Sequence, residues 1–306
     1  MSEQTLKRIL GVLGVLVLLW IGSVLLSGRR SGGGSAPDGG MASVLERLNE
    51  STVTEIRIAN ADLTVSIQRS GDAWTVNGNV ADSSAMTRLW SAITEAEVGG
   101  VAANNPRNHE RLGVSADGAR TVDFTLADGG TATVLVGNSG PITPSGFVRL
   151  PDQDAVVVVS GDLRSTLAQS VTEWRDKTVL RVDTAAVVRV VMETAAGTHI
   201  AERSDSTWSV DGEPAAAATM RLVLDELANL VAVGFVEGRE AFQDNERRVI
   251  AVGEGQDTLG TVLITGEAGS RHARTPGSDI VFEVSGFRVD RITPDIERLR
   301  LTGGGA

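Results

Sequence analysis

The sequence predicts an α+β fold of mostly antiparallel sheets, each covered by a helix. We expect this fold in two tandem homologous domains that follow an N-terminal transmembrane helix. Short runs rich in valine alternate with tight turns, as is typical of antiparallel strands. The 306-residue chain also matches itself when shifted by 134 positions, and a stretch without charged residues lies near its N-terminus.

The uncharged stretch Ile9–Leu26 holds 18 residues. At 1.5 Å per residue, a helix of this length spans about 27 Å, enough for the apolar core of a bilayer. A cleaved signal peptide is the alternative, since Lys7 and Arg8 precede the stretch. However, the apolar run is longer than a usual signal core and no A-x-A site follows it. We therefore expect an uncleaved single-pass anchor.

The orientation of the anchor depends on its flanking charges. Lys7 and Arg8 on one side are nearly balanced by Arg29 and Arg30 on the other, and the short basic tail with its free amine favours a cytoplasmic N-terminus. Residues 1–26 thus form the tail and anchor, and residues 27–42 a flexible Gly/Ser-rich linker. With the scaling of Gly-rich chains, this linker reaches about 20 to 24 Å, which keeps the domains close to the membrane.

The self-match defines the domains. Val53–Val101 aligns with Val187–Phe235 without a gap, and eleven of the 49 positions are identical, with Trp74 aligned to Trp208. Unrelated sequences of ordinary composition would share roughly three or four. We therefore expect a first repeat domain over residues 43–180 and a second over residues 181–306.

Each copy predicts the same order of strands. In the first copy they are Thr54–Ala59, Leu63–Arg69, Ala73–Val76, Thr121–Leu126, Ala132–Val136, Gly146–Leu150 and Ala155–Val159. In the second copy they are Val188–Glu193, Thr198–Arg203, Thr207–Val210, Arg248–Val252, Thr261–Thr265, Arg271–Arg274 and Ile280–Val284.

A helix follows the third strand of each copy. Its apolar residues recur at i, i+3, i+4 and i+7, which is typical of a helix packed on a core. These residues are Met86, Leu89, Trp90 and Ile93 in the first copy and Met220, Val223, Leu224 and Leu227 in the second. Ser160-Gly161 and Ser285-Gly286 are predicted to cap short closing helices.

Composition excludes several classes of function. The chain has no cysteine, which rules out disulfides, thiolate metal sites and a cysteine nucleophile. Residues 1–30 carry a net charge of +3, and subtracting this from the total of −11 leaves −14 for the rest. That acidic body argues against nucleic acid or anionic lipid as a ligand of the domains, and solubility is its simplest explanation.

No motif indicates a reaction. The chain lacks a phosphate-binding loop, a dinucleotide fingerprint, a nucleophile elbow and a zinc helix, since His109-Glu110 has no second histidine at the required spacing. His109, His199 and His272 do not repeat between the copies and are expected to be structural or exposed. Two carboxylate pairs are expected to be solvated edges: Asp152 with Asp154, and Asp295 with Glu297. We predict no catalytic, cofactor-binding or metal site.

The tryptophans allow two interpretations. Trp74 and Trp208 could be stacking platforms for a sugar or a polymer, but their place before a turn and a packed helix favours the core. Trp90 lies in the helix stripe and is also expected in the core. Trp174, between the copies, is expected to wedge the two domains together.

Several motifs occur in an order that resembles a known family. They include G-D-A-W-T-V at Gly71–Val76, the segment A-D-S-S-A-M-T-R-L, the pair Leu112-Gly113 within E-R-L-G-V, and E-W-R-D-K at Glu173–Lys177. In this order the chain resembles the family catalogued as domain of unknown function 4340, over Val53 to about Leu180 and more loosely in the second copy. The resemblance implies a single-pass protein of the bacterial inner membrane, with its domains on the periplasmic side. It carries over no catalytic residues.

Two functions are compatible with these features. The resemblance implies a non-enzymatic accessory subunit of an ABC-type exporter, with the transporter permease and ATPase as partners. The alternative is a stand-alone envelope module that binds a polymer or peptide in a groove between the copies. An enzyme would need a reaction centre that no motif indicates, so we do not expect one.

Overall fold

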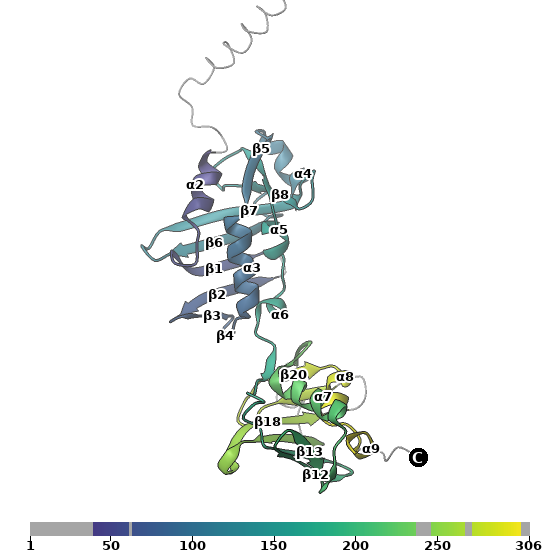
Figure 1. Cartoon of the computed structure of the whole chain (residues 1–306). Coiled ribbons are helices and arrows are strands. Elements are labelled where there is room, and N and C mark those ends of the chain that lie inside the picture. The colour runs from purple at the N-terminus through teal and green to yellow at the C-terminus, as the bar shows by residue number, and fades with distance from the viewer. Residues whose placement is uncertain (1–38, 61–62, 237–245, 267–270, 301–306) are drawn as a thin grey trace, which may run out of the picture. The chain divides into compact units, whose positions relative to one another are not determined.

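The structure is a computed structural model and describes residues 39–60, 63–236, 246–266 and 271–300 (Figure 1). The predicted transmembrane segment Ile9–Leu26 lies outside these residues, as does most of the predicted linker. Among the described residues, none of the helices combines the length and the apolar character that crossing a membrane requires.

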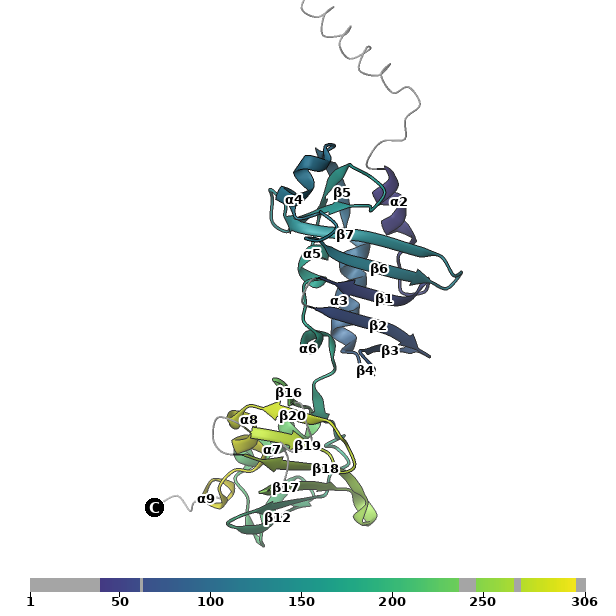
Figure 2. The same ribbon diagram turned by 180° about the vertical axis from the view of Figure 1, so that it is seen from behind.

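Two nine-stranded sheets dominate the described chain (Figures 1 and 2). The strands of the first sheet are β1 (Val53–Ala59), β2 (Thr64–Ser70), β3 (Ala73–Val76), β4 (Asn79–Val80), β5 (Glu97–Ala103), β6 (Arg120–Leu126), β7 (Thr131–Ser139), β8 (Ser145–Arg149) and β9 (Val156–Ser160). Those of the second are β11 (Arg189–Thr194), β12 (Gly197–Ser204), β13 (Thr207–Val210), β14 (Glu213–Pro214), β16 (Gly234–Val236), β17 (Arg247–Val252), β18 (Thr258–Thr265), β19 (Arg271–Arg274) and β20 (Val281–Val284).

The strand order is the same in both sheets. It is β4-β3-β2-β1-β6-β7-β8-β9-β5 in the first and β14-β13-β12-β11-β17-β18-β19-β20-β16 in the second. The sheets are mostly antiparallel, as predicted. The shared order agrees with the internal repeat of the sequence, and we call the two halves the first and second repeat.

One helix covers one face of each sheet, α3 (Ser83–Thr94) in the first repeat and α7 (Ala217–Ala228) in the second (Figures 1 and 2). The predicted apolar stripe of α3 is buried throughout. In α7 the stripe is also buried, except that Leu224 is only partly so. The side chains of the strands alternate between buried and less buried, as in β6. One face of each sheet is therefore apolar and can pack against the covering helix.

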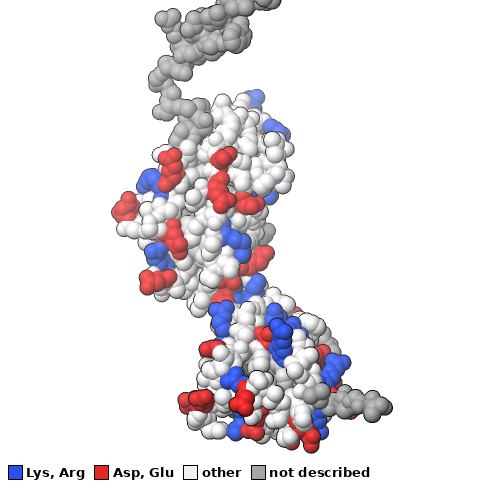
Figure 3. Space-filling view, in the orientation of Figure 1, with Lys and Arg blue, Asp and Glu red and all other residues white. Residues whose placement is uncertain are grey.

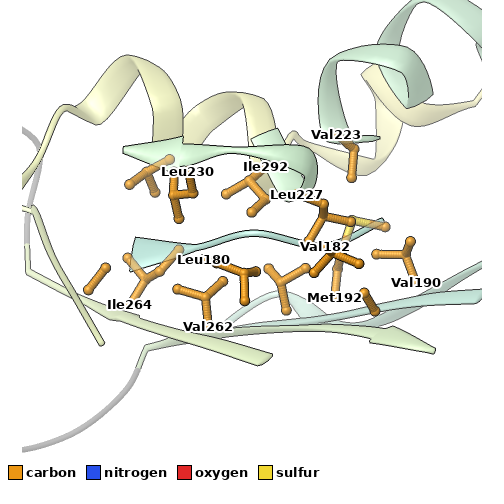
Figure 4. Packing of buried hydrophobic residues seen from close by; sticks show 14 of the residues in the cluster. Leu180, Val182, Val190, Met192, Val223, Leu227, Leu230, Val262, Ile264 and Ile292 are labelled. Atoms are coloured by element: carbon orange, nitrogen blue, oxygen red, sulfur yellow. The ribbon is translucent and has the colours of Figure 1, made fainter. Parts of the chain in front are cut away.

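The core of the second repeat shows how the layers meet (Figure 4). Side chains from the sheet face those of α7 and of α8 (Gly286–Ile292), which lies beside it. A short pair of strands, β10 (Thr178–Leu180) and β15 (Leu230–Val231), adds further apolar residues to this core. The labelled members are Leu180, Val182, Val190, Met192, Val223, Leu227, Leu230, Val262, Ile264 and Ile292.

The remaining helices are short. They are α2 (Gly39–Arg47), η1 (Pro106–Asn108), α4 (His109–Leu112), α5 (Leu163–Thr166), α6 (Val171–Trp174), η3 (Glu254–Gln256) and α9 (Ile296–Leu299). Helix α2 begins inside the segment expected to be a flexible linker, and its Met41 is buried. The last four residues of that segment are therefore part of a packed helix.

The two predicted caps behave differently. Ser285 caps α8, with its hydroxyl accepting a hydrogen bond from the Arg288 N–H at 3.4 Å. Ser160 does not cap α5, because it still belongs to β9. Gly161 then turns the chain at φ +94°, a left-handed conformation that favours glycine, and Asp162 becomes the residue before the helix.

Each repeat is closed by a short helix at its C-terminal end. The Asp82 N–H donates to the Trp174 carbonyl at 2.8 Å, and the Ala216 N–H donates to the Leu299 carbonyl at 2.7 Å. Asp82 and Ala216 both directly precede the covering helix of their repeat. Trp174 and Leu299 are fully buried. By this equivalence we assign Trp174 to the core of the first repeat, and its expected role as a wedge between the domains stays a prediction.

We predict that Trp174→Ala destabilises the first repeat by about 3 to 5 kcal/mol, because it empties a large buried site. Leu299→Ala should destabilise the second repeat by about 2 to 5 kcal/mol. Hydrogen exchange measured peptide by peptide should show faster exchange in β1 and β6 for the first variant, and in β11 and β17 for the second. Faster exchange confined to the other repeat would contradict the assignment.

Candidate functional site

A groove of about 420 Å³ lies on the helical face of the second repeat, between α7, α8 and the start of α9. Two of its lining residues are large apolar side chains that face solvent. Phe287 is 70% exposed and Leu222 is 40% exposed. The other lining residues are Thr219, Asp290, Arg291, Pro294 and Arg298.

The helices that form the groove have their core faces elsewhere. Helix α7 buries Met220, Val223 and Leu227, so Leu222 points away from the sheet. Helix α8 buries Val289 and Ile292, while Phe287 stays at the surface. The exposed pair therefore contributes little to the core of this repeat.

A buried ion-pair network joins the two walls of the groove. Glu226 on α7 is only 2% exposed. One of its carboxylate oxygens accepts from Arg288 Nη1 at 2.7 Å, and the other lies 3.1 Å from Arg291 Nη1. The Arg291 guanidinium also lies 5.4 Å from the centre of the Phe287 ring. The network thus fixes α8 against α7 and holds an arginine beside the exposed aromatic ring.

The first repeat lacks these features. At the shift of 134 positions, Leu222 corresponds to Arg88, which is exposed, and Glu226 corresponds to Ala92, which is buried. The turn before α5 reads Ser160-Gly161-Asp162 and has no aromatic residue. Because both repeats keep the same sheet, the fold does not require the apolar groove. Exposed aromatic residues beside arginine are typical of protein interfaces.

This groove was not among the features predicted from the sequence. The signal was available, because the gapless self-alignment already set Arg88 against Leu222. The pairing of α7 with α8 was not readable, since these helices are far apart in the sequence.

The three histidines lie in different places. His109 is buried, with Nε2 at 2.9 Å from the Asp154 carbonyl. His199 is partly buried on β12 and pairs with Asp211, while His272 lies on β19. Within the described ranges, no group of three or more histidine and carboxylate side chains could hold a metal ion.

The predicted carboxylate pairs are exposed. Asp295 and Glu297 line a second groove of about 690 Å³ in the second repeat, with His199, Arg247 and Thr293 among its other lining residues. The groove therefore mixes both signs of charge with apolar surface. Acidic and basic side chains are also interspersed over the face drawn in Figure 3.

The tryptophans serve the core. Trp74 is buried, with the Arg69 guanidinium 5.0 Å from its ring centre, and Trp90 is buried on α3. Trp208 is only partly buried but packs against the core of the second repeat. These contacts favour packing over a stacking platform for Trp74 and Trp208.

The Asp211 carboxylate contacts two basic side chains and a backbone N–H close to His199, which lines the second groove. Its carboxylate lies 2.8 Å from His199 Nδ1 and 3.3 Å from Arg300 Nη2, and it accepts from the Ile200 N–H at 2.9 Å. Partial burial raises the pKa of Asp211, but the Ile200 hydrogen bond together with His199 and Arg300 outweighs this and lowers it. The arrangement stabilises the ionised carboxylate.

The comparison with protein families gives one match. A family model described as "Domain of unknown function (DUF4340)" matches residues 74–248, more than half of the chain. The chain belongs to this family. The DUF4340 match starts at Trp74 in the first repeat and ends in β17 of the second, so it includes both covering helices. Neither curated proteins nor solved structures gave a match.

The ion-pair network predicts a stability effect. Glu226→Ala should cost about 1.5 to 3 kcal/mol, the range for hydrogen bonds to charged groups, because two arginines lose their buried partner. Chemical denaturation followed by peptide-resolved hydrogen exchange would measure the loss in α7 and α8. The exposed Glu297→Ala is the matched control and should change stability by about 0.5 kcal/mol or less. Equal effects of the two variants would contradict the network.

Asp211 predicts a pH effect. Because its pKa is lowered in the folded state, its ionisation stabilises the fold above the unfolded value of about 3.9, and this stabilisation is lost as the pH falls through the folded value. The stability advantage of the wild type over Asp211→Asn should hold above about pH 5 and shrink below about pH 4. Thermal unfolding of both proteins across this range measures the difference, and a difference that stays constant with pH would contradict the prediction.

Proposed function

We propose that this chain is a membrane-anchored, non-enzymatic accessory subunit of an ABC-type exporter that acts outside the cytoplasmic membrane. The observation that carries the proposal is the exposed apolar groove at Leu222 and Phe287 in the second repeat. Its expected occupant is an extracytoplasmic segment of the transporter permease. We choose the transporter as partner because the sequence motifs resemble the family named above.

The composition of the groove supports a protein occupant. Leu222 and Phe287 present apolar area, and Arg291 and Arg298 also line the groove. Within the described part of the chain, the Arg298 side chain has no ion pair, although its helix is packed. A segment with an apolar stripe and acidic flanks would match both features.

The expected membrane attachment supports a partner in the same membrane. The sequence predicts Ile9–Leu26 as the anchor in the inner membrane, with the N-terminus inside and the two repeats on the periplasmic side. The predicted tether from Ser27 to the start of α2 has 12 residues and a reach of about 17 to 21 Å. The second repeat would then meet a permease loop at high local concentration.

The second groove favours another function. Its volume of about 690 Å³ and mixed lining could hold an extended polymer or peptide, which would make the chain a stand-alone envelope binding module. The two functions differ in what they retain. A purified exporter subunit would carry permease and ATPase with it, whereas a binding module would retain a ligand that the grooves release on denaturation.

The partner proposal predicts co-purification. The full-length tagged chain, extracted in mild detergent, should bring down an ABC-type permease and its ATPase. Phe287→Asp and Leu222→Asp should each reduce recovery at least about tenfold, because each places a charge in an apolar contact. Arg88→Asp changes the equivalent exposed position of the first repeat and should leave recovery unchanged.

Other outcomes would separate the parts of this proposal. If all three variants recover equal amounts of the transporter subunits, the groove is not part of the interface. Replacing residues 9–26 by an unrelated transmembrane helix would then test whether the anchor makes the contacts. If cross-linking in intact cells recovers no transporter subunit, the exporter proposal is wrong and the binding module is the better explanation.

A further inference from the structure

One place in the first sheet differs in charge from its counterpart in the second. Strands β6 and β17 begin with equivalent arginines, Arg120 and Arg247. Ile58 and Met192 are equivalent at the shift of 134 positions. Ile58 pairs with Val122, and Met192 pairs with Val249. Each of these valines lies two residues after its arginine, so the strand register makes the two arginines equivalent. The side chains of the two arginines therefore start from the same point of the fold.

The short helix beside these strands provides the second member of each pair. Helices α5 and the end of α8 bury residues at the same spacing: Leu163, Thr166 and Leu167 in the first repeat, and Val289, Ile292 and Thr293 in the second. Aligned on this burial pattern, Arg164 corresponds to Asp290. An arginine in one repeat thus replaces a carboxylate in the other.

The second repeat neutralises its arginine internally. Arg247 Nη1 lies 3.9 Å from the Asp290 carboxylate and donates to the Thr293 hydroxyl at 2.8 Å. Asp290 belongs to α8, and Thr293 directly follows this helix. In the second repeat, the charge of Arg247 at the start of β17 is therefore met by the oxygen atoms of Asp290 and Thr293.

The first repeat brings two cations to the same place. Arg164 Nε donates to the Gly137 carbonyl on β7 at 2.9 Å, and the neighbouring Val136 is the cross-strand partner of Arg120. The side chain of Arg164 reaches this point by crossing Gly146. A Cβ on Gly146 would lie 3.0 Å from both Cβ and Cδ of Arg164, so glycine leaves the space for its stem.

The pair is electrostatically unbalanced. Both arginines are half-buried, and within the described residues neither forms an ion pair with a carboxylate. Burial, and then the positive charge of Arg164, lower the pKa of Arg120. Two partly desolvated like charges repel each other, and this cost persists unless an anion offsets it.

We propose that Arg120 and Arg164 form a binding site for a small oxyanion, a phosphate-type or carboxylate group, in the first repeat. The ligand supplies the negative charge that the Asp290 carboxylate supplies in the second repeat. Guanidinium groups suit this role because they stay charged and donate in a planar fork that matches oxyanion geometry. Both arginines are half-buried, and partly buried charges are screened less than fully exposed ones.

The experiment titrates the purified full-length chain, in an uncharged detergent, with inorganic phosphate, acetate or chloride. Calorimetry and the shift in unfolding temperature are the two readouts, since a ligand of the native state raises that temperature. Phosphate or acetate should bind more tightly than chloride. The anion that binds better identifies the class, phosphate-type or carboxylate.

Substitutions test whether Arg120 and Arg164 bind the oxyanion. Arg164→Asp copies the ion pair of the second repeat, so it should weaken oxyanion binding at least about tenfold and keep the fold. Arg164→Gln and Arg120→Gln should weaken it as well, and they carry the test if the first variant does not fold. Arg107→Gln, at an exposed arginine of the same repeat, should bind like the wild type. Equal binding in all variants, or no binding of either oxyanion to the wild type, would overturn the proposal.

Discussion

In each repeat, the apolar face of a covering helix is buried against the alternating apolar side chains of an antiparallel sheet. Helix α3 does this in the first repeat and α7 in the second. This burial is the main favourable contribution to folding, because apolar area removed from water scales with the free energy gained. The short helices α6 and α9 then close the cores at the sites of Trp174 and Leu299. The groove at Leu222 and Phe287 is built on the outer sides of α7 and α8.

The duplication acts as an internal control on what the fold requires. Positions that keep their character in both copies, such as Met86 and Met220, belong to the shared core. Positions that change character, such as Arg88 and Leu222 or Arg164 and Asp290, are not constrained by the sheet or its covering helix. The second repeat has an apolar groove whose walls Glu226 joins, whereas the described part of the first has two half-buried arginines without an ion pair. The two copies thus differ at their surfaces and share their cores.

Much of the fold was readable from local pattern. The bounds of β3, β13 and β19 were predicted as the structure has them, since alternation and turn residues mark both ends. Strand β5 was missed because it lies at a sheet edge, contains Gly99 and Gly100, and is largely exposed, so no alternation marks it. Its counterpart β16, also at an edge, was missed as well.

The candidate sites were less readable because they depend on long-range pairing. The equivalence of Arg120 and Arg247 falls outside the gapless self-alignment and appears only once the strand register is known. The groove at Phe287 needs α8 beside α7, and no local pattern gives that contact. By contrast, the polar-to-apolar change at Leu222 was present in the sequence and could have been used.

The closing helices also determine when each repeat can complete its fold during synthesis. The Trp174 carbonyl accepts a hydrogen bond from the residue before α3, and the Leu299 carbonyl accepts one from the residue before α7. Each of these hydrogen bonds joins the last part of a repeat to its middle. A chain that emerges from its N-terminus leaves each core open at one end until the short helix follows. Contacts of such long sequence separation form slowly, because a long loop must close first. Until then the apolar side chains that Trp174 and Leu299 will cover stay accessible to chaperones and proteases.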